Sequence, residues 1–359
     1  MKILFFTLGN ELVASSRTRV FQYLPHLRNK GVVCKIIQYQ SGFDYWLLSN
    51  FKKETIFQKI IFAVLFKGLG IFHFFYSFFA AMRLIVLAKK YDILFIQKAL
   101  PPVWVQKIVF RRNSRIVFDF DDAIYANEAA YDVERFNFMC SCIKLAVIEN
   151  ESTETYMNSK GIKTLKITGP IDCGRYKPKT NLTNSPAITI GWIGSGSTTG
   201  FLQLIEKALK QISKKYPNVV INFIGSSGFK IDECRIVSEK WSLETEVQLL
   251  EKFDIGIMPL PDNEWTRGKG GYKILQYMAM GIPSIASPVG VNKEIIIQNE
   301  TGILAESEEE WLTAFEKLIT EHDLSIQLGN NARIRAKNNY SFAASTPVLL
   351  DAIRKLILA

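Results

Sequence analysis

Short apolar runs of strand length alternate with amphipathic stretches along most of the chain. We expect strands at residues 2–7, 32–39, 92–98, 115–120, 145–150 and 164–169, and again at 187–194, 219–225, 235–240, 254–260, 283–287 and 301–305. Helical patterns lie between many of these runs, at residues 18–31, 104–112, 201–216, 244–253 and 272–281. Helices that alternate with buried strands predict parallel sheets covered on both faces, which is an α/β fold.

A segment rich in Pro, Gly, Asn and Thr interrupts this pattern in the middle of the chain. It covers residues 171–186 and has the composition of a linker between domains. We therefore expect one doubly wound domain at residues 1–170 and a second at 187–344. Ligands of such open sheets bind beyond the carboxyl ends of the strands, so we expect the site in a cleft between the two domains.

The net charge of +10 over 359 residues is distributed unevenly. Residues 1–180 hold 26 basic and 14 acidic side chains, whereas residues 181–359 hold 18 and 20. The excess of the first half lies between Arg28 and Arg115, and nine phenylalanines fall within residues 51–80. Nucleic-acid surfaces interleave basic residues with single aromatics and polar residues, so this window argues against nucleic acid. It predicts contact with an anionic membrane surface through residues 51–90.

The aromatic window is too short to predict a spanning helix. Lys67 and Arg83 leave an uncharged run from Gly68 to Met82, and a spanning helix needs about 20 apolar residues. We expect shallow insertion, with a buried core helix over residues 60–88 as the alternative. The first residues do not read as a secretory signal, and five dispersed cysteines and three histidines support neither disulfides nor zinc. We expect a cytoplasmic protein at the inner face of the cell membrane.

A glycine-rich turn follows the strand expected at residues 187–194. It consists of Gly194, Ser195, Gly196, Ser197 and Thr198, leads into a helical pattern, and is neither a Walker motif nor a full GxGxxG. Glycines let the backbone approach an anion, and the N–H groups at a helix start favour phosphate. A tight turn from strand to helix also needs glycine for steric reasons alone, so both interpretations stay open.

A second glycine-rich loop precedes the helix expected at residues 272–281. It supplies three cations among three glycines, namely Arg267, Gly268, Lys269, Gly270, Gly271 and Lys273. Cations and flexible backbone at the start of a helix suit a diphosphate. A solvated basic loop is the alternative, although Lys273 falls inside the helix among apolar neighbours, where an unpaired charge would be costly.

These motifs resemble the family-four (GT4) retaining glycosyltransferases, which have the GT-B fold. The segment GYKILQYMAMGIPSIASPVG carries most of the resemblance, together with KILFFT, GWIGSGSTT and PIDCGRYKP. The resemblance implies two Rossmann-like domains facing across a cleft, a nucleoside-diphosphate-sugar donor bound mainly by the second domain, and an acceptor bound mainly by the first. It also implies that no metal or other cofactor is required, and that a C-terminal helix at residues 345–359 packs back on the first domain.

The chain departs from the family at the residues that bind the donor. Relatives carry two spaced glutamates, and the matching positions here are Gly268 and Gln276, with Glu264 as a substitute for the first. The amide of Gln276 can still bond ribose hydroxyls. Relatives also bring an arginine and a lysine to the diphosphate through the first glycine-rich turn, where this chain has only hydroxyl side chains. We infer that the three cations of the second loop supply that charge.

The first domain offers carboxylates and arginines near its strand ends. Asp119, Asp121 and Asp122 follow an expected strand, and Asp121 matches a position where many relatives have a histidine. Asp121 is therefore the catalytic candidate beside the sugar, and Asp122 is either an acceptor-side residue or a helix cap. One carboxylate triplet is weak support for magnesium. Arg17 is placed to contact diphosphate or acceptor, with Arg19 as its alternate.

The expected reaction is transfer of a hexosyl group from a nucleoside diphosphate to a hydroxyl with retention. The acceptor would be a lipid-linked glycan in surface polysaccharide or lipopolysaccharide assembly, and fixed cations would stabilise the leaving diphosphate. A catalytically silent nucleotide-sugar-binding partner is one alternative, because both clamp carboxylates are missing. A GT-B-type sugar-nucleotide epimerase is another, disfavoured by the three scattered histidines. No full GxGxxG with a following acid supports a dehydrogenase.

Overall fold

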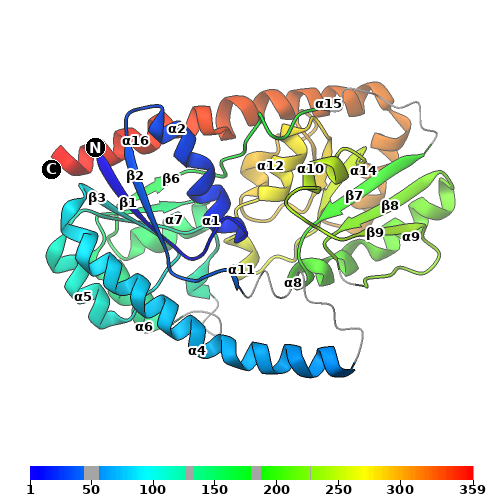
Figure 1. Ribbon diagram of the computed structural model, residues 1–359. Coiled ribbons are helices and arrows are strands. Elements are labelled where there is room, and N and C mark those ends of the chain that lie inside the picture. Colours follow the sequence, from blue (N-terminus) through cyan, green and yellow to red (C-terminus); the bar gives the residue numbers. More distant parts are fainter. Residues whose placement is uncertain (44–55, 127–131, 179–186, 227, 359) are drawn as a thin grey trace. The chain divides into compact units, whose positions relative to one another are not determined.

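The chain forms two compact α/β units (Figure 1). The computed structural model describes residues 1–43, 56–126, 132–178, 187–226 and 228–358. The first unit comprises Met1–Ile148, Thr153–Lys166 and Thr346–Ala359, and the second comprises Glu149–Ser152 and Ile167–Ser345. Two parts of the sequence predictions lie outside the described residues: 51–55 of the expected membrane segment and 179–186 of the expected linker.

A parallel sheet forms the centre of the first unit. Within the described residues its order is β2-β1-β3-β4-β5-β6, and every neighbouring pair is parallel. The strands are β1 (Lys2–Thr7), β2 (Val33–Gln38), β3 (Ile93–Gln97), β4 (Ile116–Asp119), β5 (Leu145–Ile148) and β6 (Thr164–Lys166). All six lie within the apolar runs that predicted them, because strands covered on both faces must be apolar along their length.

Helices cover both faces of this sheet. They are α1 (Ala14–Arg19), α2 (Leu24–Arg28), α4 (Ile56–Leu87), α5 (Val103–Arg112), α6 (Val133–Cys142) and α7 (Glu151–Ser159). Figure 1 shows α4, α5 and α6 on one face and α1 and α2 on the other. On the first of these faces Phe6, Leu84, Val105 and Met139 belong to one buried core cluster.

The helix expected at residues 18–31 is interrupted. α1 ends at Arg19, one 3-10 turn covers Phe21–Tyr23, and α2 begins at Leu24. Pro25 is the physical reason, because proline lacks an N–H and clashes with the preceding turn inside a helix, whereas the first turn of a helix accepts it. The expectation of one continuous helix there was wrong.

The second unit repeats the architecture. Within the described residues its sheet has the order β12-β11-β10-β7-β8-β9. The strands are β7 (Ile188–Ile193), β8 (Val219–Ile224), β9 (Ile236–Glu239), β10 (Ile255–Met258), β11 (Ser284–Ala286) and β12 (Ile303–Leu304). One core cluster lies between this sheet and α9 and α14, and a second lies on the opposite face beneath α12. The sheet therefore buries both of its faces, as the apolar runs predicted.

The helices of the second unit include several single turns beside the strand ends. They are α8 (Gly196–Thr199), α9 (Glu206–Lys215), α10 (Glu246–Leu250), α11 (Glu264–Arg267), α12 (Tyr272–Ala279), α13 (Asn292–Ile295), α14 (Glu308–Thr320) and α15 (His322–Arg335). The helix expected at residues 201–216 starts as a 3-10 segment, Gly200–Ile205, and becomes α-helical only at Glu206.

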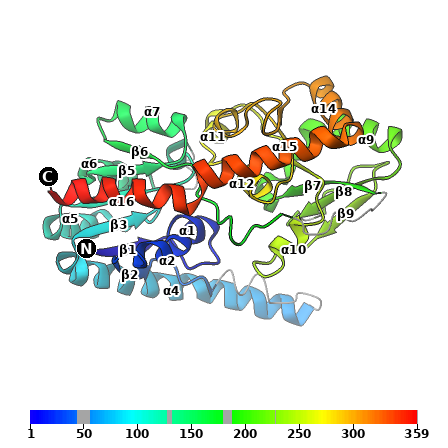
Figure 2. The same cartoon turned by 90° about the horizontal axis from the view of Figure 1, so that it is seen from above.

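The last helix belongs to both units. α16 (Phe342–Leu358) begins in the second unit, and its residues from Thr346 onward are counted with the first (Figure 2). Leu349, Leu350 and Ile353 of α16 are buried. The expected return of the C-terminal helix to the first domain is therefore confirmed.

Candidate functional site

Two glycine-rich segments of the second unit meet at Lys273. The first is the turn after β7, and a Cβ added to Gly194 would lie 2.4 Å from the Trp192 ring and 2.8 Å from Lys273 Nζ. Lys273 Nζ also donates to Thr198 Oγ1 at 3.3 Å, from the second position of α12. Only glycine fits at position 194, because the indole and the ammonium group already occupy the space of a side chain.

The ammonium group of Lys273 is held in surroundings that disfavour its charge. It lies 4.4 Å from the centre of the Trp192 ring, and although the residue keeps some exposure, the Nζ end is enclosed. Burial, and then the nearby charge of Lys269, lower the pKa of Lys273 from 10.5 to about 7. A desolvated cation between two glycine-rich segments is the arrangement that a bound anion would stabilise.

The second glycine-rich loop is held by residues that the sequence analysis did not single out. A Cβ added to Gly270 would lie 1.3 Å from Glu149 Oε2, so the Glu149 carboxylate packs directly against the loop backbone. The Asn150 amide donates to the carbonyl of Lys269 at 3.5 Å. Glu149 and Asn150 are buried and follow β5 directly. Their place at the carboxyl end of a strand is the signal that could have identified them.

The three predicted cations of this loop have different surroundings. Lys269 Nζ lies 3.7 Å from the centre of the Trp265 ring. Arg267 is exposed, and its guanidinium forms a two-point ion pair with Asp262 at 2.5 and 3.0 Å. Lys273 is therefore the predicted cation that the fold places against the Gly194 turn, whereas the charge of Arg267 is balanced by a neighbouring carboxylate.

Gln276 is directed into the interior of the second unit. It is buried, and its amide nitrogen donates to Tyr176 Oη at 3.1 Å. The Tyr176 hydroxyl donates in turn to the buried carboxylate of Glu246 at 2.5 Å, and Trp241 Nε1 donates to the other oxygen of that carboxylate at 2.7 Å. The amide expected to contact ribose is thus part of a buried network that fixes Trp241.

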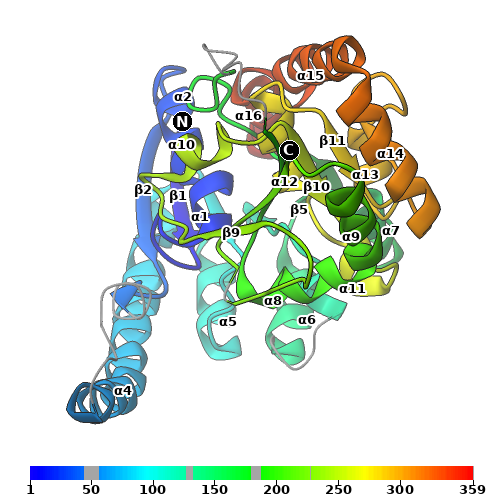
Figure 3. The same ribbon diagram turned by 90° about the vertical axis from the view of Figure 1, so that its right-hand side faces the viewer.

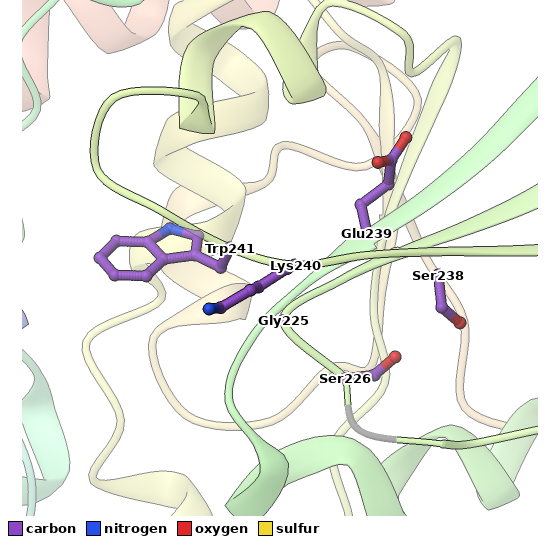
Figure 4. Close-up of a pocket in the computed structure, with 6 residues that line it drawn as sticks. All are labelled: Gly225, Ser226, Ser238, Glu239, Lys240 and Trp241. Atoms are coloured by element: carbon purple, nitrogen blue, oxygen red, sulfur yellow. The ribbon is translucent and has the colours of Figure 1, made fainter. Parts of the chain in front are cut away.

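A cavity of about 350 Å³ adjoins the first glycine-rich turn. Figure 4 shows its lining, which consists of Gly225, Ser226, Ser238, Glu239, Lys240 and Trp241. Gly225 has a φ of +80°, and a Cβ there would lie 2.2 Å from the carbonyl oxygen of Gly194. The cavity, the Gly194 turn and Lys273 therefore form a continuous row at the carboxyl ends of β7 and β8.

The remaining residues of the first turn form local contacts. The hydroxyls of Ser195 and Ser197 lie 2.8 Å apart, and Ser195 precedes α8, which starts at Gly196. In the second loop, Gly268 ends α11 and Gly271 precedes α12 with a φ of +68°. A side chain at position 271 would meet Ile295 and adopt a backbone that only glycine tolerates well.

The candidate residues of the first unit form two ion-paired groups. Arg19 and Asp119 make a buried pair, with Arg19 Nη2 donating at 2.6 Å. Lys98 Nζ donates to Asp121 at 2.7 Å and to Asp122 at 2.9 Å. Burial raises the pKa of Asp119, and the Arg19 guanidinium opposes that rise. Arg19 is thus a structural partner of Asp119, and Lys98 is a cation that the sequence analysis missed.

Arg17 is also largely buried. Its guanidinium donates to the carbonyl of Glu11 at 3.0 Å, so this bond ties α1 to the loop after β1. Among the residues that the structure describes, no three histidine, cysteine or acidic side chains cluster as metal ligands would.

Comparison with solved structures relates this architecture to a known fold. HepE from Anabaena, solved with UDP and glucose, is 15% identical over 99% of this chain and 100% of its own, with a TM-score of 0.71. Sucrose-phosphate synthase from Thermosynechococcus elongatus is 14% identical over 100% and 99%, with a TM-score of 0.70. A glycosyltransferase from Rickettsia africae is 16% identical over 99% and 98%, with a TM-score of 0.69. These similarities confirm the expected GT-B fold of two Rossmann-like domains.

The second unit also matches a sequence family. Residues 187–321 match the family model described as "Glycosyl transferases group 1". No curated protein sequence matches the chain. The second unit therefore carries a group 1 glycosyltransferase domain, and the narrower GT4 assignment stays a prediction.

Proposed function

We propose that this protein transfers a hexosyl group from a nucleoside diphosphate to a hydroxyl, with retention at the anomeric carbon. The observation that carries the proposal is the enclosed ammonium group of Lys273 between the Gly194 turn and the second glycine-rich loop. A cation with a lowered pKa gains most from a dianionic ligand, because the ligand supplies the charge that burial has removed. HepE was solved with UDP and with UDP-glucose, which supports the same class of donor here.

The row of features in the second unit gives each part of such a donor a place. The cavity beside Trp241 would take the base, and the Gly194 turn with Thr198 would approach the diphosphate. Lys273 would bind the phosphate that leaves with the nucleotide. Gln276 is assigned a positioning role, because it bonds Tyr176 inside the unit.

In the proposed reaction the bond from the anomeric carbon to the β-phosphate oxygen breaks, and its electron pair stays on that oxygen. The acceptor hydroxyl oxygen forms the new glycosidic bond, and its proton passes to the leaving phosphate. Charge grows on the phosphate in an oxocarbenium-like transition state, so a fixed cation at Lys273 lowers the barrier. No metal or other cofactor enters these steps.

The acceptor is assigned to the first unit. Asp121 and Asp122 present carboxylates that Lys98 holds at the carboxyl end of β4, where they could accept bonds from sugar hydroxyls. The exposed phenylalanines of α4 in the same unit support a lipid-linked glycan as the acceptor. Such an acceptor would place the reaction at the cytoplasmic face of the cell membrane, in the assembly of a surface glycan.

The test combines donor binding with turnover. The protein is mixed with UDP, GDP, ADP and CMP conjugates of sugars, and a rise in melting temperature identifies the donor. Release of the nucleotide is then measured for the wild type, for Lys273→Ala and for the control Lys214→Ala on the exposed end of α9. Loss of Lys273 should lower kcat about a hundredfold, comparable to loss of an oxyanion donor, and the control should not change it.

Two results would contradict the proposal. Unchanged turnover in Lys273→Ala would remove Lys273 from the mechanism. A donor that raises the melting temperature but is never turned over, with any hydroxyl acceptor supplied, would favour the silent nucleotide-sugar-binding protein.

A further inference from the structure

Helix α4 carries a row of exposed aromatic side chains on the first unit. Ile71, Phe74, Phe75 and Phe79 are exposed by 67, 65, 53 and 61%. In Figure 3 the N-terminal part of α4 extends away from β1 and β2 of the same unit. Within the described residues, Gly68–Lys90 is long and apolar enough to cross a membrane by length and composition, yet little of it is buried.

These side chains share one face of the helix. Successive residues of an α-helix are about 100° apart, so positions 71, 75, 78, 79, 82 and 86 fall on one side. The opposite side holds Ala80, Ala81, Leu84 and Ala88, which are buried in the core of the first unit. The apolar face is therefore an addition to the core of this unit and not a part of it.

Neither sequence interpretation of this segment holds for its whole length. The core helix expected over residues 60–88 is found only from Ala80 onward, where α4 packs against the sheet. A spanning helix would require that packed part to leave the core, so the structure disfavours it. Residues 68–79 cover only about 18 Å at 1.5 Å per residue, well short of a hydrocarbon layer of about 30 Å.

The surroundings of the apolar face are basic. Arg83, Lys89 and Lys90 are exposed at the C-terminal end of α4. Between residues 68 and 112 the sequence has a single acid, Asp92, whose carboxylate accepts from the backbone N–H of Lys2. A second copy of this chain would bring the same positive charge to the face and be repelled, whereas an anionic lipid surface would be attracted.

We propose that the exposed face of α4 docks on an anionic lipid bilayer, with the helix lying in the headgroup region. The phenylalanines would enter the acyl boundary by about 5–10 Å, and Arg83, Lys89 and Lys90 would contact the headgroups. The membrane partner expected for residues 51–90 is thereby reduced to the side chains of one helix face. The inference rests on the proposed function only in that a lipid-linked acceptor explains why this enzyme would be held at a membrane.

The experiment is flotation of the full chain with lipid vesicles, in the absence of donor and acceptor. Vesicles of phosphatidylcholine alone are compared with vesicles that also contain phosphatidylglycerol, each at low and high salt. Phe75→Ser/Phe79→Ser should lower binding to the mixed vesicles about tenfold or more. Leu204→Ser/Ile334→Ser, which changes equally exposed apolar residues of the second unit, should bind like the wild type.

The charged residues are tested in the same assay. Lys89→Glu/Lys90→Glu should bind less and lose most of the dependence on phosphatidylglycerol. Wild-type protein that stays unbound with both kinds of vesicle, or a Phe75→Ser/Phe79→Ser variant that binds normally, would overturn the proposal. So would a phenylalanine variant that only converts dimers to monomers in sedimentation, because the occupant would then be a second copy. Turnover of a water-soluble acceptor is measured separately, so failure of docking and failure of the proposed function are distinguishable.

Discussion

Replacing Lys273 by methionine should make the ligand-free protein more stable near neutral pH. The lysine places a charge against Trp192 and the Gly194 turn, and its pKa of about 7 records the cost of that charge. Methionine has a similar unbranched shape without a charge, so it should fill the same space. A residue kept for binding an anion is expected to destabilise the protein while the anion is absent.

The magnitude follows from the pKa. A fall from 10.5 to about 7, at about 1.4 kcal/mol for each unit, sets an upper bound of about 4 to 5 kcal/mol on the cost. The bond to Thr198 and the remaining exposure of Lys273 reduce it, so we expect Lys273→Met to raise the free energy of unfolding by about 1 to 3 kcal/mol.

The pH dependence gives the sign. The unfolded chain binds the Lys273 proton more tightly than the folded chain, so wild-type stability rises with pH between about 7 and 10.5. The advantage of the variant should be complete below about pH 7 and should disappear as the pH approaches 10.5.

Urea unfolding followed by circular dichroism, at pH values from about 6 to about 10, measures this effect. Lys214→Met, at an exposed lysine of α9, is the matched control and should show no such trend. If Lys273→Met is no more stable than the wild type at neutral pH, or if its advantage does not shrink as the pH rises, the ammonium group is not desolvated and the reasoning fails.

Two further substitutions test the contacts around the candidate residues. Arg19→Met should destabilise the protein by about 3 to 5 kcal/mol, because it leaves Asp119 buried without its cation, and adding Asp119→Leu should recover most of the loss in urea unfolding. Gly270→Ala should cost about 1 to 3 kcal/mol, because its Cβ would overlap the Glu149 carboxylate. Gly200→Ala, where a Cβ meets nothing within 4 Å, should be neutral, and equal thermal shifts for the two alanine variants would contradict the contact.

Local sequence was sufficient to predict the strands. Each apolar run became a strand of one of the two parallel sheets, because a strand buried on both faces needs apolar residues along its whole length. The helices were less predictable. Apolar spacing extended one helix through Pro25 and made another begin at residue 201, where the chain instead forms a 3-10 segment.

The candidate site was predictable as separate segments. The two glycine-rich segments and Lys273 stood out by composition, since glycine and cations beside a strand end are uncommon without a reason. Their meeting through Trp192 and Thr198 joins residues far apart in the chain. The roles expected for Arg267 and Gln276 could not account for Asp262 or Tyr176, because a partner in space leaves no mark at the residue itself.

The sequence by itself determined the α/β class, the two sheets and the segments that carry charge, glycine and aromatic residues. Only the tertiary structure decided what each segment faces. α4 shows the reason: apolar residues surround the helix on nearly every side, so periodicity cannot tell which face packs. Contact with the sheet buries Leu84 and leaves Phe75 exposed. In the same way, burial against neighbours brought from elsewhere in the chain makes Lys273 an unusual cation.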